Sequence, residues 1–390
     1  MERIFVVTAP GLYRLAANEM AHLGLIPADQ QTKSIDELTT LDEVIIHEGG
    51  VEFSGTLNDL YRSNLQIRTA SRVLARIGNF HAAAFSELRK KASRLEWERY
   101  LHTGQPVAFR VTCRKSRLYH SDAVAERVLG AIGDRLGTQP KVEKFNEESG
   151  EELPQLILLR LFRDQCTVSV DSSGAILHRR GYRQETAKAP LRETLAAGML
   201  MASGWESHKP LLDPFCGSGT IPIEAAMMAL NIPPGYNRRF AFMNWPGFQP
   251  DIWESLLEET RPNGQTEMPR IFASDRDAGA IQAAMNNAER AGVAEFIEFS
   301  CKSVSEIEPD GIGWVATNPP YGLRISANKD LRNLYAQFGN VLRAKFAGWR
   351  IAVLCNDPQL LGQIGLQLDT SQTFDNGGVT VKLGQARIPG

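Results

Sequence analysis

Between residues 210 and 355 short apolar runs alternate with amphipathic segments, and no other feature of the sequence limits the possible folds as strongly. The segments are PLLDPFCGSGTIPIEAAMMAL, RIFASDRDAGAIQAAMNNAERAG, GWVATNPPYGLR with DLRNLYAQFGNVLRAKF, and RIAVLCND. An apolar run opens each segment, and a helical pattern follows in all but the last. Such alternation is typical of a mostly parallel sheet with helices on both faces. We therefore predict an α/β domain in the C-terminal part of the chain.

The residues before this alternation predict two small α+β units. Residues 1–70 contain two strand-helix pairs, with a Pro-Gly turn in the first pair and Thr56 as the N-cap of the second helix. Residues 71–165 contain further helical segments between apolar strands. The predicted domains are therefore 1–70, 71–165 and 166–390, and the third of them begins with a linker over 166–185.

The composition excludes several classes of protein. The five cysteines are scattered and form no C-x-x-C pair, which indicates reduced thiols and neither a zinc site nor a redox pair. No apolar run approaches the length of a membrane span, so we expect a cytoplasmic protein. The formal net charge of −2 argues against binding nucleic acid through overall charge. Two segments, Cys113–Val128 and His178–Arg192, are nevertheless locally basic, although such runs commonly lie on solvated faces.

The stretch LLDPFCGSGTIPIEAA predicts a ligand loop between a strand that ends at Asp213 and a helix that begins at or just after Thr220. Gly217 and Gly219 let backbone amides approach a ligand at the helix N-terminus. The loop lacks the third glycine of a dinucleotide site and the Gly-Lys-Ser/Thr of a P-loop, and Asp213 would repel phosphate. A cofactor with ammonium and sulfonium groups suits this acid better, and a plain helix-start turn is the alternative. Cys216 has no histidine nearby in sequence, so we interpret it as a packing residue rather than a nucleophile.

Two further strand ends carry polar residues. The run RIFASD ends at Asp275, and in sheets of this type an acid at the end of the second strand commonly accepts ribose hydroxyls. Asp277 is better suited to cap the helix that follows. The run GWVAT is followed by Asn318 and two prolines, which stop the strand because proline cannot donate to the sheet ladder. A rigid turn without further function is the alternative interpretation.

These segments give the chain a resemblance to a known family. The loop Asp213–Thr220, then Asp275, then Asn318–Tyr321 resemble class I S-adenosylmethionine methyltransferases that act on exocyclic amino nitrogens. HRRGYRQETAKAPLRETLAAGML and NIPPGYNRRFAFMNWPGF are similar to the THUMP-domain guanine-N2 RNA methyltransferases of the RlmL/YpsC type. GVEFSGTLNDLYRSNLQIRTASRVL and WERYL with SRLYHSDAVAERV resemble that group's ferredoxin-like and THUMP regions. The resemblance implies a Rossmann-like class I methyltransferase domain preceded by ferredoxin-like and THUMP domains.

The resemblance also implies S-adenosylmethionine as cofactor and RNA, first of all ribosomal RNA, as partner; it leaves the oligomeric state open. The residues expected to bind the cofactor are Asp213, Cys216, Gly217, Ser218, Gly219, Thr220, Asp275, Arg276, Ser303 and Asn318. Ser303 stands where we expect an acid that contacts adenine, so its hydroxyl or a backbone group would replace that acid. The residues expected to contact RNA are Arg114, Lys115, Arg117, Arg179, Arg180 and Arg183.

The catalytic residues implied are Asn318, Pro319, Pro320 and Tyr321. An exocyclic amine is a poor nucleophile because its lone pair is delocalised into the ring. Two acceptors aimed at its N–H bonds, the Asn318 side-chain oxygen and the Pro319 carbonyl, would favour the localised form, and the prolines fix their relation. Tyr321 is expected to offer a flat face on which the flipped-out base stacks.

The predicted activity is methyl transfer to the exocyclic N2 of a guanosine, most readily in 23S ribosomal RNA. Methylation of a transfer RNA guanosine, of N6 of a DNA adenine, or of a protein glutamine uses the same Asn-Pro-Pro-Tyr chemistry, and these activities remain alternatives. Two small α+β units stand where a DNA methylase normally carries a base-reading domain. From a different class, a non-catalytic RNA-binding or assembly protein with a retained fold is a further alternative, against which the apparently complete site argues.

Overall fold

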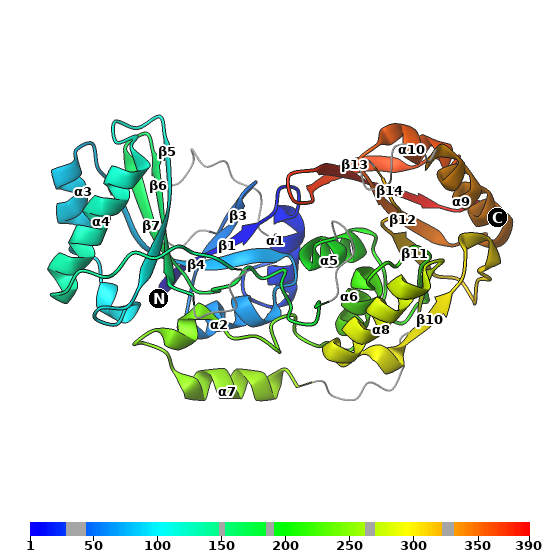
Figure 1. Cartoon of the computed structure of the whole chain (residues 1–390), viewed down its shortest axis with the longest axis horizontal. Helices are drawn as coiled ribbons and strands as arrows, with labels where there is room; N and C mark the ends of the chain where they lie inside the picture. The colour runs from blue at the N-terminus through cyan, green and yellow to red at the C-terminus, as the bar shows by residue number, and fades with distance from the viewer. Residues whose placement is uncertain (29–43, 148–152, 185–190, 262–269, 322–330) are drawn as a thin grey trace.

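The computed structural model describes residues 1–28, 44–147, 153–184, 191–261, 270–321 and 331–390. Within these residues the chain forms two seven-stranded sheets, one toward each end of an elongated molecule (Figure 1). The first sheet has the strand order β2-β3-β1-β4-β7-β6-β5, and the second has the order β10-β9-β8-β11-β12-β14-β13. None of the described helices is long and apolar enough to cross a membrane. The predicted fold class, an α/β domain after α+β units, is confirmed.

The first sheet is antiparallel except for the pair β5 and β6. Its strands are β1 (Glu2–Thr8), β2 (Ile45–His47), β3 (Gly50–Gly55), β4 (Ala70–His81), β5 (Val107–Arg114), β6 (Gln155–Phe162) and β7 (Gln165–Asp171). Its helices are α1 (Tyr13–His22), α2 (Leu57–Gln66), α3 (Phe85–Ala92) and α4 (Ser121–Leu136), with a short 3-10 helix at Trp97–Arg99. The predicted cap of α2 is present, because the Thr56 hydroxyl accepts the backbone N–H of Asp59 at 3.2 Å in a capping box.

Strand β4 joins the two N-terminal units into one sheet. On one side it pairs with β1, with Ala75 opposite Ile4, and on the other it pairs with β7, with Phe80 opposite Cys166. A strand that belongs to both units ties them through two hydrogen-bonded ladders. The two units therefore cannot rotate against each other without breaking one of these ladders.

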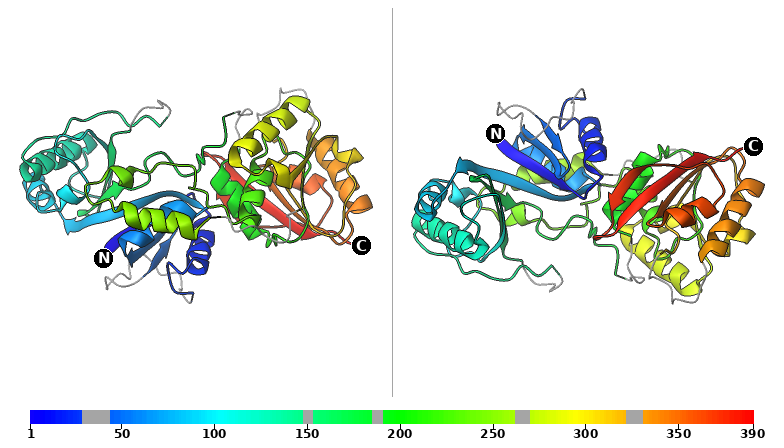
Figure 2. Two further views of the ribbon diagram at one scale, coloured as in Figure 1. Left: turned by 90° about the horizontal axis from the view of Figure 1, so that it is seen from below. Right: turned by 90° about the horizontal axis from the view of Figure 1, so that it is seen from above.

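The structure corrects the expected boundary of the C-terminal domain, which was placed at residue 166. Strand β7 pairs with β4 and β6, so residues 166–171 belong to the first sheet. Helix α7 (Pro250–Glu259), which was expected in the C-terminal domain, packs against α2 in the N-terminal half (Figures 1 and 2). The first core takes in aromatic and aliphatic side chains from this later part of the chain, namely Phe240, Phe242, Trp245, Trp253 and Leu256.

The ring of Phe242 shows how closely this later segment is integrated into the N-terminal half. It stacks on Tyr61 of α2 with ring centroids 4.3 Å apart and an interplanar angle of 19°. It also contacts the edge of Trp253, at a centroid distance of 5.5 Å. Aromatic pairs of this kind contribute about 0.5–1.5 kcal/mol each beyond the area they bury. The segment from Phe240 to Leu256 is thus part of the N-terminal core rather than a surface segment of the C-terminal half.

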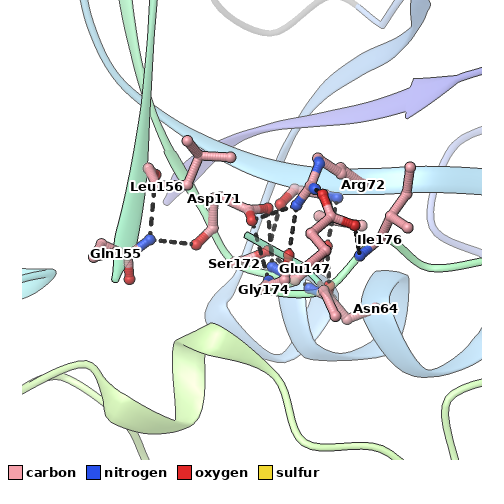
Figure 3. Close-up of polar contacts among 12 residues, drawn as sticks. Asn64, Arg72, Glu147, Gln155, Leu156, Asp171, Ser172, Gly174 and Ile176 are labelled. Atoms are coloured by element: carbon pink, nitrogen blue, oxygen red, sulfur yellow. Dashed lines mark hydrogen bonds and ion pairs between the residues drawn. The ribbon is translucent and has the colours of Figure 1, made fainter. Parts of the chain in front are cut away.

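A buried polar cluster fixes the point where the first sheet passes into the linker (Figure 3). Arg72 of β4 donates to Asp171 at 2.7 Å and to the carbonyl of Gly174, and it forms a second ion pair with Glu147. Gln155 donates to the Asp171 carbonyl at 2.7 Å. Burial raises the pKa of Asp171, and the Arg72 charge opposes that shift. Removing one partner of such a pair would strand a buried charge, so the cluster specifies how these segments meet.

The second sheet is parallel from β10 through β12 and ends in an antiparallel hairpin. Its strands are β8 (Leu211–Asp213), β9 (Ile271–Asp275), β10 (Ile297–Cys301), β11 (Trp314–Thr317), β12 (Arg350–Cys355), β13 (Asp369–Asp375) and β14 (Thr380–Arg387). Its helices are α5 (Glu193–Ala202), α6 (Thr220–Ala229), α8 (Ala278–Ala291), α9 (Leu331–Lys345) and α10 (Pro358–Gln363). The parallel strands agree with the prediction, whereas the hairpin of β13 and β14 was not predicted.

Candidate active site

Three neighbouring strands end at one edge of the second sheet and bring the polar residues together. Strand β8 ends at Asp213 and pairs in parallel with β9, which ends at Asp275. On its other side β8 pairs with β11, which ends just before Asn318. Because parallel strands have their carboxyl ends at the same edge, residues separated by more than a hundred positions become neighbours.

The loop between β8 and α6 has the backbone that its glycines predict. Gly217 and Gly219 have φ angles of +53° and +85°, in the left-handed region that favours glycine. A Cβ at Gly219 would lie 3.0 Å from the Cβ of Ala284, so this glycine also lets α6 pack closely against α8. A Cβ at Gly217 would meet no heavy atom of the described chain within 4 Å, which leaves space over the loop. Helix α6 begins at Thr220, as expected.

Asp213 is buried at the bottom of this edge, with 2% of its surface exposed. It accepts a hydrogen bond from the Thr317 hydroxyl at 2.6 Å and another from the backbone N–H of Phe215 at 3.1 Å. Desolvation raises the pKa of Asp213 to about 7; the two hydrogen bonds oppose the shift and the charge of Asp275 adds to it. A cation placed beside this buried carboxyl group would stabilise its ionised form.

Asp275 connects the end of β9 to the glycine loop. One carboxylate oxygen accepts the backbone N–H of Gly217 at 3.1 Å, and the other accepts the backbone N–H of Asp277 at 3.1 Å. A carboxylate oxygen can accept more than one hydrogen bond, so both oxygens keep capacity for a ligand. Asp277 caps α8 by accepting from Gly279 at 2.8 Å, as predicted. Arg276 lies exposed between the two acids.

Asn318 presents a buried acceptor at the end of β11. Its Oδ1 atom is shielded from solvent and has no hydrogen-bond partner among the described residues. Buried polar atoms are nearly always paired, so an unsatisfied acceptor at a strand end needs a specific explanation. Pro319 is buried behind it, and the Pro320 carbonyl accepts the Tyr335 hydroxyl at 3.4 Å.

The structure corrects the expectation for Tyr321. Its side chain is 2% exposed and belongs to the apolar core of the second sheet. The aromatic ring is buried in that core, so it offers no open face for a base in this structure. The expected stacking role is therefore wrong for this arrangement of the chain.

Ser303 begins the turn after β10 and uses its hydroxyl locally. The hydroxyl donates to Glu306 at 2.6 Å and the backbone N–H donates to the same carboxylate at 2.9 Å, which closes a capping box around Val304–Glu306. The hydrogen bond from Ser303 lowers the pKa of Glu306. A carboxylate is thus present in this turn, three residues after Ser303, and it was not singled out from the sequence.

Of the six residues expected to contact RNA, four lie on the surface. Arg114, Lys115 and Arg117 are exposed where β5 ends, and Lys115 has a left-handed φ of +53°. The backbone N–H of Arg117 donates to Asp164 at 2.7 Å, which holds the turn. Arg179 is exposed in the linker.

Arg180 and Arg183 were expected to contact RNA, and the structure contradicts this for both. Arg180 is 3% exposed and lies 3.4 Å from the Glu224 carboxylate. The Arg183 side chain is 11% exposed and lies 3.2 Å from the Glu193 carboxylate. Both guanidinium groups face inward because buried carboxylates on α5 and α6 neutralise them. The run of basic residues does not reveal this, because Glu224 lies far from Arg180 in sequence. Glu193 follows Arg183 in the same segment, but nothing in the sequence marked it as the partner of Arg183.

Two residues of the site were not singled out from the sequence. Thr317 holds Asp213 through its hydroxyl, and its place directly before Asn318 was the available signal. Asn287 of α8 donates to the Ser218 carbonyl at 3.1 Å and so supports the glycine loop from behind. Asn287 carries no local sequence signal, because only the packing of α8 on α6 brings it to the loop. Cys216 is buried with its pKa raised well above the usual value by desolvation, which agrees with a packing role.

Known protein families match three consecutive parts of the chain. Residues 3–74 match the model of the RlmL ferredoxin-like domain, and residues 82–171 match the THUMP domain. Residues 180–383 match the RMKL-like methyltransferase domain, which by itself spans more than half of the chain. The matched ranges agree with the extent of the first sheet, which ends at residue 171.

Related proteins match over nearly the full length of the chain. The ribosomal RNA large subunit methyltransferase K/L of Syntrophotalea carbinolica is 36% identical, over 97% of this chain and 53% of that protein. A putative RNA methyltransferase of Synechocystis is 34% identical, over 97% of this chain and 95% of that protein. The chain thus spans about half the length of the K/L relative. The solved structure of SMU.472, a putative methyltransferase complexed with SAH, is 28% identical with a TM-score of 0.83, over 100% of this chain and 98% of that one.

Proposed function

The chain belongs to the family of RMKL-like methyltransferases that carry an RlmL ferredoxin-like domain and a THUMP domain, and we propose that it methylates the exocyclic N2 of a guanosine in 23S ribosomal RNA. S-adenosylmethionine is the proposed methyl donor. The names of the K/L relatives support ribosomal RNA as the substrate class. The choice of a guanosine as the methylated nucleotide, and of its N2 as the methylated atom, goes beyond what those names say.

The observation that carries the proposal is the unsatisfied oxygen of Asn318. An exocyclic amine brings two N–H donors, and one of them fits a buried acceptor that has no partner in the described chain. A hydrogen bond to Asn318 would draw the lone pair of the amine out of the ring and aim it toward the glycine loop. The Pro319 carbonyl is the proposed second acceptor. Together they would orient the nitrogen without removing a proton before the transfer.

The residues around the loop fit a cofactor with an amino acid, a sulfonium and a nucleoside. S-adenosylmethionine would supply a methyl group already activated by its sulfonium, so positioning can provide much of the rate. Asp213 would attract the ammonium, and the amides at the start of α6 would meet the carboxylate. Asp275 would accept the ribose hydroxyls, and the space over Gly217 leaves room for the ligand. Glu306 beside Ser303 is the proposed contact for the adenine.

The RNA is proposed to reach this site from the N-terminal half. Arg114, Lys115 and Arg117 form an exposed basic turn at the end of β5, within the range that matches the THUMP domain. Phosphate contacts of this kind supply attraction rather than sequence recognition. The exposed turn and the active site beside the cofactor loop would then contact different parts of one RNA molecule.

The test is mass spectrometry of ribosomal and transfer RNA from cells with and without the protein. We expect one N2-methylguanosine of 23S ribosomal RNA to disappear without the protein and to return with the wild-type chain but not with Asn318→Ala. Purified protein with isotope-labelled S-adenosylmethionine and separate RNA, DNA and protein substrates identifies the direct target. Label only on transfer RNA, DNA adenine or protein would replace the proposed substrate, and no label on any substrate would support the non-catalytic alternative.

A further inference from the structure

The basic linker before α5 contacts the first residue of α6 and a side chain of α8. Its residue Arg183 contacts three acceptors through one atom, Nη2. This nitrogen donates to the Leu191 carbonyl at 2.7 Å and to the Thr220 hydroxyl at 2.9 Å, and it lies 3.2 Å from a carboxylate oxygen of Glu193. The side chain of Arg183 therefore occupies a junction inside the protein rather than a surface available to phosphates.

The three acceptors of Arg183 lie at the starts of two helices. Glu193 is the first residue of α5, and Leu191 lies just before that helix. Thr220 is the first residue of α6, directly after the glycine loop. Thr220 is buried, and its hydroxyl is held by Arg183 from the side of the linker. One guanidinium group thus sets where α6 begins relative to α5 and the linker.

A second contact connects the same linker to the loop. The backbone N–H of Gln184 donates to the Asn287 side-chain oxygen at 3.4 Å, and Asn287 in turn donates to the Ser218 carbonyl at 3.1 Å. Ser218 lies between the two glycines of the loop. The linker therefore supports the loop on both sides of Gly219, through Thr220 and through Ser218.

The loop needs such support because its own residues give it little rigidity. Gly217 and Gly219 have wide conformational freedom, which costs entropy when a ligand requires one fixed arrangement. A cation near the start of a helix is also disfavoured by the helix dipole, so Arg183 lies where charge alone would not favour it. Glu193 at the first turn of α5 offsets this by pairing with Arg183. Holding the loop in its ligand-ready form lowers the ordering cost of binding.

We propose that Arg183 is a positioning residue of the cofactor loop, which it holds in the binding conformation through the Thr220 hydroxyl. This inference rests on the proposed function, because it takes the loop to be the S-adenosylmethionine site. The sequence of the linker suggests that Arg183 contacts RNA. The inference instead gives Arg183 a role in cofactor binding. Arg183 acts through Thr220 and the start of α6 and does not itself touch the methyl donor.

The test uses the full-length chain and measures the affinity for S-adenosylmethionine by calorimetry and the affinity for ribosomal RNA by filter binding. Arg183→Gln should weaken S-adenosylmethionine binding about three- to tenfold, the size of one net hydrogen bond, and leave RNA affinity unchanged. Arg183→Lys should recover part of the loss, because an ammonium also offers several donors at one nitrogen. Arg239→Gln is the matched control, since it removes the same charge from an exposed position and should change neither affinity.

A double-mutant cycle separates positioning from general stabilisation. If Arg183 acts through Thr220, then Arg183→Gln should have much less effect on S-adenosylmethionine affinity in a Thr220→Ala background than in the wild type. Additive effects would overturn the inference, as would wild-type cofactor affinity in folded Arg183→Gln or a loss of RNA affinity alone. Should Arg183→Gln fail to fold, unchanged cofactor affinity in both Arg183→Lys and Thr220→Ala would overturn it equally. A wild-type chain that binds no S-adenosylmethionine would instead refute the proposed function.

Discussion

Asp213 ends a buried strand beside the glycine loop, and burial controls its charge. The folded pKa of about 7 lies above the ordinary value of 3.8, so the folded protein binds this proton more tightly than the unfolded chain. The carboxyl group therefore lowers the stability of the fold progressively as the pH rises from about 4 to 7. Asp213 destabilises the fold at neutral pH, and it lies where a bound cationic ligand would offset that loss of stability.

We predict that S-adenosylmethionine affinity rises with pH between about 6 and 7.5, because the ammonium of the ligand favours the ionised form of Asp213. Calorimetric titrations across this range would measure the dependence. Asp213→Asn should bind the cofactor weakly and with a flatter pH profile. An identical pH profile in the wild type and in Asp213→Asn would show that another group controls the dependence.

The second prediction at this scale concerns Asn318. Asn318→Ala should leave most of the cofactor affinity intact and reduce the methylation rate about a hundredfold or more, because its hydrogen bond strengthens as the amine approaches the transition state. Asn318→Asp keeps an acceptor oxygen and should lose less activity than the alanine variant. Single-turnover rates with saturating cofactor make the comparison. A parallel loss of cofactor affinity and rate would assign Asn318 to binding instead.

Single residues also show where sequence reasoning succeeds and fails. Asp213, Asp275 and Asn318 could be found because strand ends in a parallel sheet are visible as apolar runs that stop at a polar residue. Tyr321 could not be placed correctly, since its burial depends on packing with residues distant in sequence, which no local pattern reports. Asn287 could not be found because its contact with Ser218 arises only from helix packing.

At the scale of elements, the basic residues in the turn after β5 differ from those on helices α3 and α4. The difference is how closely each basic side chain approaches a carboxylate. On α3 and α4, Arg89 pairs with Asp134 at 2.7 Å, and Lys91 pairs with Glu87 at 2.6 Å. Arg117, at the end of β5, is 79% exposed and approaches Asp164 only to 4.0 Å. Cations without close carboxylates remain available to phosphates.

We predict that replacing Arg114, Lys115 and Arg117 with alanine weakens RNA binding and flattens its salt dependence. The slope of log affinity against log salt should decrease by up to about 0.9 for each lost duplex phosphate contact and by less for single strands. A control triple variant, with alanine at Arg89, Lys91 and Arg135, removes the same charge from the helical side. Filter binding across a salt series tests both, and equal slopes for the two variants would show that the turn makes no specific contact.

The strands and helices of this molecule were mostly predictable, whereas their assignment to domains was not. The periodicity of α4 and the apolar runs of β6 and β11 are local signals that survive in the structure. Strand β7 joins the first sheet through a short hairpin with β6, which the sequence interpretation overlooked, and through long-range pairing with β4. The addition of Phe240 to Leu256 to the first core depends on long-range contacts that no local pattern reports. The hairpin of β13 and β14 was missed because its first strand is largely polar.

At the scale of the whole molecule, we predict that the catalytic half is not independent. A fragment that begins near residue 175 would expose Phe240, Phe242, Trp245 and Trp253, whose partners lie in the N-terminal half. Exposed aromatic surface of this extent favours aggregation. The fragment should bind a hydrophobic dye more strongly than the full chain and elute as aggregates in size-exclusion chromatography. A monomeric fragment with native-like cofactor affinity would contradict this.

The return of residues 240–256 to the first core also concerns the order in which the protein is made. On the ribosome, β7 is complete once residue 171 has emerged, but the core beneath α2 still lacks the rings of Phe242 and Trp253. The N-terminal half therefore stays incomplete while the linker, α5, β8 and the cofactor loop are synthesised. Contacts between parts so distant in sequence form slowly, and unfinished cores are prone to misassembly. The nascent chain thus finishes its N-terminal half only after the cofactor loop has already left the ribosome.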